Sequence, residues 1–251
     1  MLTLNRDARV AIESHAVRCY PNEACGLIVQ GDYIPCTNIG PDPARGFVIP
    51  SREYANAEDQ GEIQAIVHSH PDAGALPSIE DLTACATSSI AIWIIVNVSR
   101  DQEDRPYVGR FHLFSKSVEG CALIGLRFAH GTNDCYGLVR RYYRAAIGLN
   151  LPDFSRSGIW WDDGQSSLYM ENYKAAGFVS IGCDASLHEG DVLLMAVASR
   201  RGIPNHAAVY LGDDTILHHL WNQLSRREGL PRYRAHVTHV LRHRDMLEWN
   251  R

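Results

Sequence analysis

Residues 64–81 read QAIVHSHPDAGALPSIED, and this stretch decides the fold of the first half of the chain. Residues 64–67 are apolar enough to predict a buried strand that leads directly into His68. A loop follows, and Ser78 then predicts the N-cap of a helix that runs to about Ser88. A strand, a loop and a helix in this order indicate an α/β arrangement around a sheet.

The same stretch carries two histidines and one aspartate in the pattern of a metal site. His68 and His70 lie two residues apart, so both side chains leave the same face at the end of a strand. Asp81 is expected in the first turn of the following helix, where it can converge with the two histidines. Two imidazoles and one carboxylate form a tetrahedral zinc site with one position open to water, as catalytic zinc sites have.

Two further residues fit catalysis at this site. Glu23, at the entry to a predicted strand, is the candidate general base. Ser78 lies one helical turn from Asp81 and is placed to hydrogen-bond a developing oxyanion. The alternative is an ordinary helix cap beside surface histidines, but the full pattern at this spacing favours the metal site. Whether the zinc serves catalysis or assembly is left open by the residues alone.

These five residues resemble the motif of the JAMM/MPN metallopeptidases. In that motif an upstream glutamate precedes H-x-H, seven residues, a serine, two residues and an aspartate, and each element is present here. The resemblance covers about residues 1–115. It implies a zinc peptidase that acts on isopeptide or related amide bonds, often those of ubiquitin-like proteins.

The rest of the first half completes a domain with a mixed sheet. A helix over 6–19 is predicted to bury one face made of Ala8, Ile12, Ala16 and Cys19. The predicted strands are 25–29, 33–38, 64–67, 90–98 and 107–114. The hydrophobic pattern changes after residue 115, and we place the domain boundary there, with one domain over 1–116 and a second over 117–251.

The second domain is predicted to be a helix followed by a curled antiparallel sheet. Helices are predicted over 133–147 and 166–176, and the predicted strands are 191–197, 206–211, 215–220 and 235–242. This order fits a papain-like half-barrel, so the whole chain is predicted to contain two α+β domains. Between the helices, Trp160 and Trp161 are expected either in the core or at the lip of a substrate site.

A cysteine and two histidines form the second candidate site. Cys135 opens a predicted helix, where the helix dipole and free N–H groups favour its thiolate. His206 begins a strand whose antiparallel neighbour ends at His218 and His219, so His218 can orient His206. A buried core thiol and an ordinary strand histidine are the alternative, and a register shift of one residue would substitute His219 for His218.

The sequences DCYGLV at 134–139 and HAAVYL at 206–211 resemble the motifs of NlpC-type cysteine peptidases over about residues 120–245. The resemblance implies that Cys135 is the nucleophile, His206 the base and acid, and His218 the orienting residue. It also implies that the peptide stems of bacterial peptidoglycan are the substrate, cut at an amide bond that involves diaminopimelate.

One position departs from the NlpC-type pattern. Members of that family often have a tyrosine shortly before the cysteine, where it helps to bind substrate or the oxyanion. The corresponding stretch here contains Phe128, which cannot donate a hydrogen bond, and His130, which can. We therefore expect an effect on efficiency and none on the type of reaction.

The two motifs in one chain resemble the tail assembly proteins of long-tailed bacteriophages, of the lambda K type. The resemblance implies other phage tail tip proteins as partners and local opening of peptidoglycan. It implies a location in the host cytoplasm during assembly, then at the virion tail tip acting in the periplasm. The alternative is a structural assembly factor whose zinc domain binds or processes a partner tail protein.

The composition is that of an ordinary globular protein, with 45% hydrophobic and 21% charged residues among 251. A formal net charge of −5 argues against nucleic acid as a partner. The longest apolar run, residues 90–98, is too short to span a membrane, and residues 1–6 lack the apolar core of a signal peptide. The seven cysteines are irregularly spaced, so no disulfide framework is expected; Cys25, Cys85 and Cys121 are predicted core residues.

Overall fold

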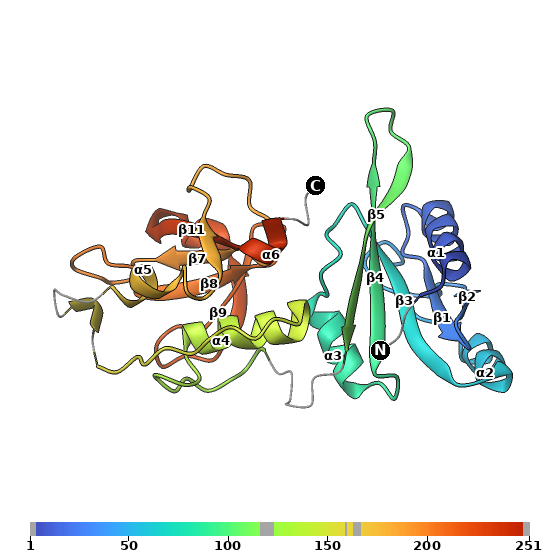
Figure 1. Ribbon diagram of the computed structural model, residues 1–251, viewed down its shortest axis with the longest axis horizontal. Helices are drawn as coiled ribbons and strands as arrows, with labels where there is room; N and C mark the ends of the chain where they lie inside the picture. Colours follow the sequence, from blue (N-terminus) through green and yellow to red (C-terminus); the bar gives the residue numbers. More distant parts are fainter. Residues whose placement is uncertain (1–3, 116–122, 159, 163–166, 248–251) are drawn as a thin grey trace. The chain divides into compact units, whose positions relative to one another are not determined.

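The computed structural model describes residues 4–115, 123–158, 160–162 and 167–247 (Figure 1). The chain divides into two compact units, residues 1–119 and 120–251. The predicted boundary between residues 116 and 117 lies outside the described residues, as does Cys121.

The first unit is built on a five-stranded mixed sheet, which confirms the predicted fold class. Its strands follow the spatial order β2-β1-β3-β4-β5. Strands β3 and β4 are parallel, and the other neighbouring pairs are antiparallel. The strands are β1 Cys25–Val29, β2 Asp32–Cys36, β3 Ile63–Pro71, β4 Ile92–Arg100 and β5 Pro106–Ser115.

Helices α1 (Arg6–Cys19) and α3 (Ile79–Thr87) lie on opposite sides of this sheet in Figure 1. Helix α1 buries Ala8, Ile12 and Ala16 as predicted, but the fourth buried residue is His15 and Cys19 is only half-buried. His15 can be buried because its Nδ1 atom lies 2.8 Å from the Tyr33 hydroxyl, which gives the imidazole a hydrogen-bond partner.

Helix α2 (Ser51–Gln60) was not predicted, because its sequence SREYANAEDQ has almost no apolar face. Ala57 is its one buried residue, so the sequence of this helix has no apolar repeat from which a helix could be predicted.

Strand β3 is longer than predicted, and this matters for the site. It continues through His68 and His70, because it pairs in parallel with β4 as far as Pro71. The two histidines therefore lie near the end of a central strand of the sheet. The regular alternation of a strand directs both of their side chains to one face.

The second unit contains a six-stranded antiparallel sheet in the order β10-β9-β8-β7-β11-β6, as the predicted half-barrel requires. The strands are β6 Phe178–Ser180, β7 Val192–Met195, β8 His206–Tyr210, β9 Thr215–His218, β10 Arg226–Gly229 and β11 Val237–His243. Strands β6 and β10 were not predicted, because both are short and β10 has the polar sequence RREG.

The helix predicted over 133–147 is present as helical structure over 135–147, and the helix predicted over 166–176 ends earlier than predicted. Helix α4 (Cys135–Tyr142) begins after its N-cap Asp134 and continues as one π-helical segment, Tyr143–Ile147. Helix α5 (Leu168–Asn172) ends before Gly177, whose φ of 90° turns the chain into β6; the predicted start at residue 166 lies outside the described residues. The remaining helical segments are α6 Arg244–Leu247 and the 3₁₀ turns Trp160–Asp162, Leu230–Arg232 and Arg234–His236.

The described cysteines are all free, and Cys25 and Cys85 are buried as predicted. Among the described residues, no helix has the length and apolar character that crossing a membrane requires.

Candidate active sites

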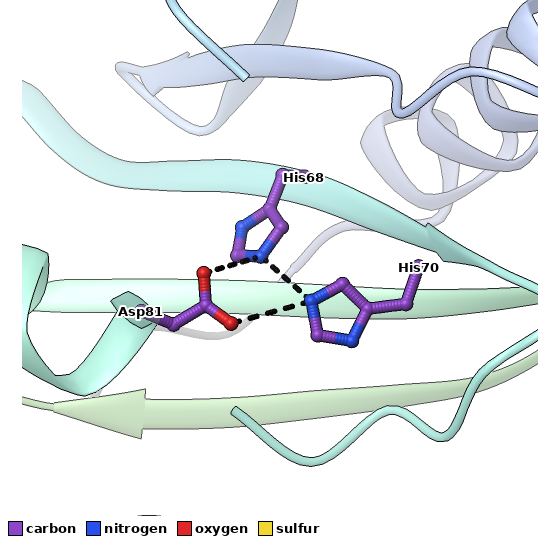
Figure 2. A group of neighbouring side chains, drawn as sticks. All are labelled: His68, His70 and Asp81. Carbon is purple, nitrogen blue, oxygen red and sulfur yellow. Dashed lines mark hydrogen bonds and ion pairs between the residues drawn. The ribbon is translucent and has the colours of Figure 1, made fainter. Parts of the chain in front are cut away.

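Three donor groups converge in the first unit, from the end of β3 and the first turn of α3 (Figure 2). The Nε2 atoms of His68 and His70 lie 3.1 Å apart. The Oδ1 atom of Asp81 lies 3.1 Å from Nε2 of His68, and its Oδ2 atom lies 3.3 Å from Nε2 of His70. These atoms all lie within 4.8 Å of one another, which is the arrangement that one small cation can bridge.

Each donor group is held by neighbours that fix its direction. Asp81 and Ser78 form a capping box at the start of α3, in which the Ser78 hydroxyl donates to Oδ2 of Asp81 at 2.7 Å. The Nδ1 atom of His70 lies 2.9 Å from the carbonyl oxygen of Gly74. The ring of His68 stacks on Phe47 with centroids 4.7 Å apart. Such outer contacts hold metal-binding side chains in one orientation.

The protonation states fit a cation. Burial lowers the pKa of His68, so its ring is neutral near pH 7. Burial opposes ionisation of Asp81, but the two histidines hold the pKa of this carboxyl well below its usual range. Burial also opposes the charge of His70, but Asp81 raises its pKa, so metal binding at His70 would release a proton.

Glu23 lies buried just before β1 and is held by its backbone. Its N–H donates to the carbonyl oxygen of Pro43 at 2.6 Å, and its own carbonyl accepts from Asn38 at 3.0 Å. Burial raises the pKa of Glu23 to about 7, with smaller opposing effects of the charges on His70 and Asp81. A carboxyl group that titrates near neutrality suits a general base.

Ser78 contacts a member of the donor cluster, and its predicted role toward an oxyanion stays a prediction. Its hydroxyl donates to Asp81 and so orients a donor group of the cluster. A role toward a developing oxyanion would require that hydroxyl to turn away from Asp81.

The second candidate site begins at the N-terminus of α4. Asp134 caps this helix by accepting from the N–H of Gly137 at 2.9 Å. Cys135 is the first helical residue, and the N–H groups of Tyr136 and Ala207 favour its thiolate. Ala207 follows His206 in β8, so the sulfur lies beside the strand that carries this histidine. A Cβ at position 137 would collide with the carbonyl oxygen of Thr132, which explains the glycine of the DCYG motif.

The electrostatics of Cys135 combine the predicted effect of the helix start with an opposing effect of burial. Burial of the sulfur and the charge of Asp134 raise the pKa of the thiol, and they outweigh the N–H groups that favour the thiolate. The position at a helix start favours the thiolate, as expected from the sequence. The sequence does not show that folding removes water from around the sulfur, and this loss of water favours the neutral thiol.

We therefore expect Cys135 to react with iodoacetamide as a thiol of raised pKa. Because the pKa is raised, the thiolate fraction at pH 7 is smaller than for a free cysteine, and the rate should still increase above pH 9. Mass spectrometry of the modified peptide as a function of pH measures this. A rate that reaches its plateau below pH 7 would instead indicate a preformed thiolate–imidazolium pair.

The two histidines of this site are in contact. Nε2 of His206 lies 3.2 Å from Nδ1 of His218, and both side chains are buried. Burial and the neighbouring imidazoles lower the pKa of His206 to about 3, so it is a neutral base near pH 7. His219 is directed elsewhere: its Nε2 atom lies 3.0 Å from the carbonyl oxygen of Gln223.

Two residues near these groups had no signal in the sequence. The Tyr169 hydroxyl, from α5, lies 3.1 Å from the sulfur of Cys135. Tyr169 thus places beside the cysteine a hydroxyl, the group that Phe128 lacks. The Phe128 ring packs against His219. Oε2 of Glu228, from β10, lies 2.8 Å from Nε2 of His218. Only the tertiary fold brings either residue to the site.

The two tryptophans have different environments. Trp160 is buried and contacts the Tyr169 ring with centroids 5.8 Å apart, so it belongs to the core beside the cysteine. Trp161 is half-buried and contacts Trp221, whose side chain is 51% exposed. The first is therefore packing, and the second lies at the margin of the surface.

Asp134 also forms a buried ion pair that supports the N-terminus of α4. Arg156 donates from Nε to Oδ2 of Asp134 at 2.9 Å, and both side chains are at most 5% exposed. The same oxygen accepts from the N–H of Gly131 at 2.8 Å. Asp134 therefore joins the helix cap, the preceding turn and the loop around residue 156.

We expect Asp134→Ala to lower the free energy of unfolding of the second unit by about 3–5 kcal/mol, because Arg156 would keep a buried charge without its main partner. Asp153→Ala is the matched control, since Asp153 also bonds to Arg156 but is 50% exposed; its effect should be at most about 1 kcal/mol. Urea unfolding followed by tryptophan fluorescence measures both. Equal effects of the two variants would contradict the buried role of Asp134.

Comparison with known families defines the class of protein. Residues 5–110 match the Prok-JAB family, described as prokaryotic homologs of the JAB domain. Residues 125–243 match the NlpC/P60 family. The chain is thus a two-domain protein with a JAB-like N-terminal domain and an NlpC/P60 C-terminal domain.

The relatives of the whole chain define the family. The tail tip assembly protein K of Escherichia phage N15 is 31% identical over 242 residues, which are 94% of this chain and 94% of that protein. The protein of the same name from Escherichia phage lambda is 40% identical over 76% of this chain and 87% of its own length. The chain belongs to this family of phage tail tip assembly proteins. Among solved structures, an NLP/P60 family protein from Staphylococcus aureus is 18% identical over 48% of this chain and 37% of its own, with a TM-score of 0.34.

Proposed function

We propose that this tail tip assembly protein cleaves amide bonds in the peptide stems of bacterial peptidoglycan. The observation that carries the proposal is the contact of His206 with His218 beside Cys135, inside a domain of the NlpC/P60 family. The function follows from the chemistry of these groups in a protein that a phage tail would bring to the cell wall.

Cys135 is the nucleophile of the proposed reaction. Neutral His206 takes the proton from the thiol as the sulfur attacks the carbonyl carbon of the stem amide. The protonated imidazole then gives this proton to the leaving amine, and the acyl group remains on the sulfur as a thioester. His206 next takes a proton from water, the hydroxide attacks the thioester, and the proton returns to the sulfur as the acid leaves.

Tyr169 and His218 support these steps. The Tyr169 hydroxyl is placed to donate to negative charge beside the sulfur. His218 holds the ring of His206 through the 3.2 Å contact and stabilises the imidazolium that forms during attack. His219 has no part in this scheme.

For the first domain we propose a zinc ion bound by His68, His70 and Asp81. One ionised carboxylate and two imidazoles, which bind metal as neutral rings, fit this cation. Bound zinc would supply Lewis-acid polarisation of an amide carbonyl. Glu23 would move the proton as general base, and Ser78 would orient Asp81. The bond cut would be an amide in a protein partner of the tail.

The proposed location follows from the family. We infer that the protein is made in the host cytoplasm, joins the tail tip with other tail proteins, and acts on the wall in the periplasm. Neither nucleic acid nor a membrane span is part of this proposal.

A second function is favoured by the names of both relatives, which describe assembly. In it the chain is a structural assembly factor, and its zinc domain binds or processes a partner tail protein. Incubation of the purified full-length protein with purified cell walls separates the two functions. Release of stem peptides, identified by mass spectrometry, supports the hydrolase; no release at any pH from 5 to 9 leaves the assembly role.

Glu23→Gln tests the division of roles in the first domain. The amide cannot take a proton but has nearly the same shape, so metal content should be unchanged while any metal-dependent cleavage falls by about 100-fold or more. Metal analysis and a cleavage assay on partner tail proteins measure the two effects. If the zinc is lost as well, Glu23 is a ligand and not the base.

A further inference from the structure

Glu228 lies on the side of His218 that faces away from His206. It comes from β10, where Arg226 pairs directly with His218 of β9. Oε2 of Glu228 is 2.8 Å from Nε2 of His218, and Nδ1 of His218 is 3.2 Å from Nε2 of His206. Three side chains thus form a continuous line of hydrogen bonds that ends at the base of the proposed reaction.

The carboxyl of Glu228 is held in its ionised form. The Tyr233 hydroxyl donates to Oε2 at 2.5 Å, Arg226 contacts the same oxygen at 3.0 Å, and Arg232 contacts Oε1 at 3.1 Å. Burial opposes the charge, but the hydrogen bonds from Tyr233, His218 and Arg226 lower the pKa of Glu228 to about 2. Near neutral pH this side chain can therefore only accept hydrogen bonds.

Because Glu228 can only accept, it determines which ring nitrogen of His218, and then of His206, carries the proton. His218 has to donate from Nε2 to Glu228, so a neutral His218 ring leaves Nδ1 as an acceptor. His206 then has to donate from its own Nε2 to that Nδ1. The unprotonated nitrogen of His206 is consequently Nδ1, the only ring nitrogen that remains to take a proton.

We propose that Glu228 is a positioning residue that fixes the tautomers of His218 and His206 and so presents Nδ1 of His206 as the base. The proposal rests on the proposed cysteine chemistry for its consequence in catalysis, but the tautomers themselves follow from the contacts. Without the carboxylate, His218 can turn its proton to Nδ1. His206 would then have to accept at Nε2, and its proton would lie on Nδ1, where it blocks the base.

The tautomers can be measured on the unmodified full-length protein. Long-range ¹H–¹⁵N spectra at pH 7.5 distinguish Nδ1–H from Nε2–H rings, and signals lost in His206→Asn and His218→Asn assign the two residues. We expect both rings as Nε2–H. A proton on Nδ1 of either residue would overturn the proposal, and this result does not depend on any activity.

Three variants then test the role of Glu228. In Glu228→Gln the amide oxygen should replace Oε2, because the donors gathered there repel the NH₂ group; the tautomers should stay and kcat should fall less than about threefold. In Glu228→Leu the acceptor is lost, and kcat for wall hydrolysis should fall at least about tenfold with little change in KM. Tyr233→Phe is the matched control, since it removes another hydrogen bond from the same carboxylate and should keep the tautomers.

Alkylation of Cys135 gives a readout that needs no substrate. The rate at pH 7.5 should fall in Glu228→Leu and stay within about twofold in Glu228→Gln and Tyr233→Phe, because only the first change removes the acceptor. If the unmodified protein does not cleave cell walls, the proposed function fails, and the spectra and alkylation rates still decide the role of Glu228. Equal rates and tautomers in Glu228→Leu and the unmodified protein would overturn it.

Discussion

Replacing Cys135 with alanine should abolish peptidoglycan cleavage, with a loss of at least about 10³-fold in kcat. The sulfur lies beside the strand that carries His206, whose ring contacts His218, and the Tyr169 hydroxyl is 3.1 Å from it. Without it, no acyl intermediate can form. Release of stem peptides from purified walls, followed by mass spectrometry, measures the effect.

Cys183→Ser is the matched control for this variant. Cys183 is an exposed thiol of the same domain, and its sulfur lies 3.3 Å from the carbonyl oxygen of Thr238. It should retain activity within about twofold, as surface substitutions usually do. EDTA should leave wall cleavage unaffected, because the proposed cysteine reaction has no step that needs a metal. Cleavage that survives Cys135→Ala but is lost with EDTA would assign the activity to the first domain.

The parts of the site that follow local rules were predictable from sequence. The spacing of His68 and His70 is enough to bring them to one face, since alternate residues of a strand share a face. Asp81 lies at the third helical position after its serine cap, where a capping box orients its carboxylate. His206 and His218 flank a tight turn between two strands, so antiparallel pairing brings them together.

The parts that depend on tertiary packing were not predictable. Tyr169 lies 34 residues after Cys135, and nothing in its neighbourhood distinguishes it from other tyrosines. Glu228 lies on a short polar strand that the hydrophobic pattern does not show. The effect of the helix start on Cys135 was predictable, but the burial that raises the pKa of its thiol was not, because it depends on residues distant in sequence.

The two sites also differ in how their chemistry depends on folding. At the cysteine site, burial keeps His206 neutral. The effect of this imidazole on the stability of the second domain therefore depends on pH within a defined range. The pKa of His206 falls from 6.5 in the unfolded chain to about 3 in the fold. The second domain is therefore expected to lose stability as pH decreases from about 6.5 toward 3, because the buried imidazole has to become charged.

At the other site the metal itself should hold the fold together. Changing both His68 and His70 to alanine should reduce bound zinc from about one ion per chain to almost none, because one carboxylate alone cannot retain it. Melting of the first domain should move to lower temperature and become insensitive to EDTA, whereas the unmodified protein should lose thermal stability when EDTA is added. Metal analysis by mass spectrometry and differential scanning calorimetry measure the two effects.

His15→Ala is the matched control for the loss of zinc. His15 is a buried histidine of the same domain whose partner is Tyr33, so its removal should lower stability without changing the zinc content. If the double variant keeps its zinc, or if His15→Ala loses it equally, the cluster of His68, His70 and Asp81 is not the binding site. In that case the converging donor atoms would be an ordinary buried network, in which Asp81 accepts hydrogen bonds from both histidines.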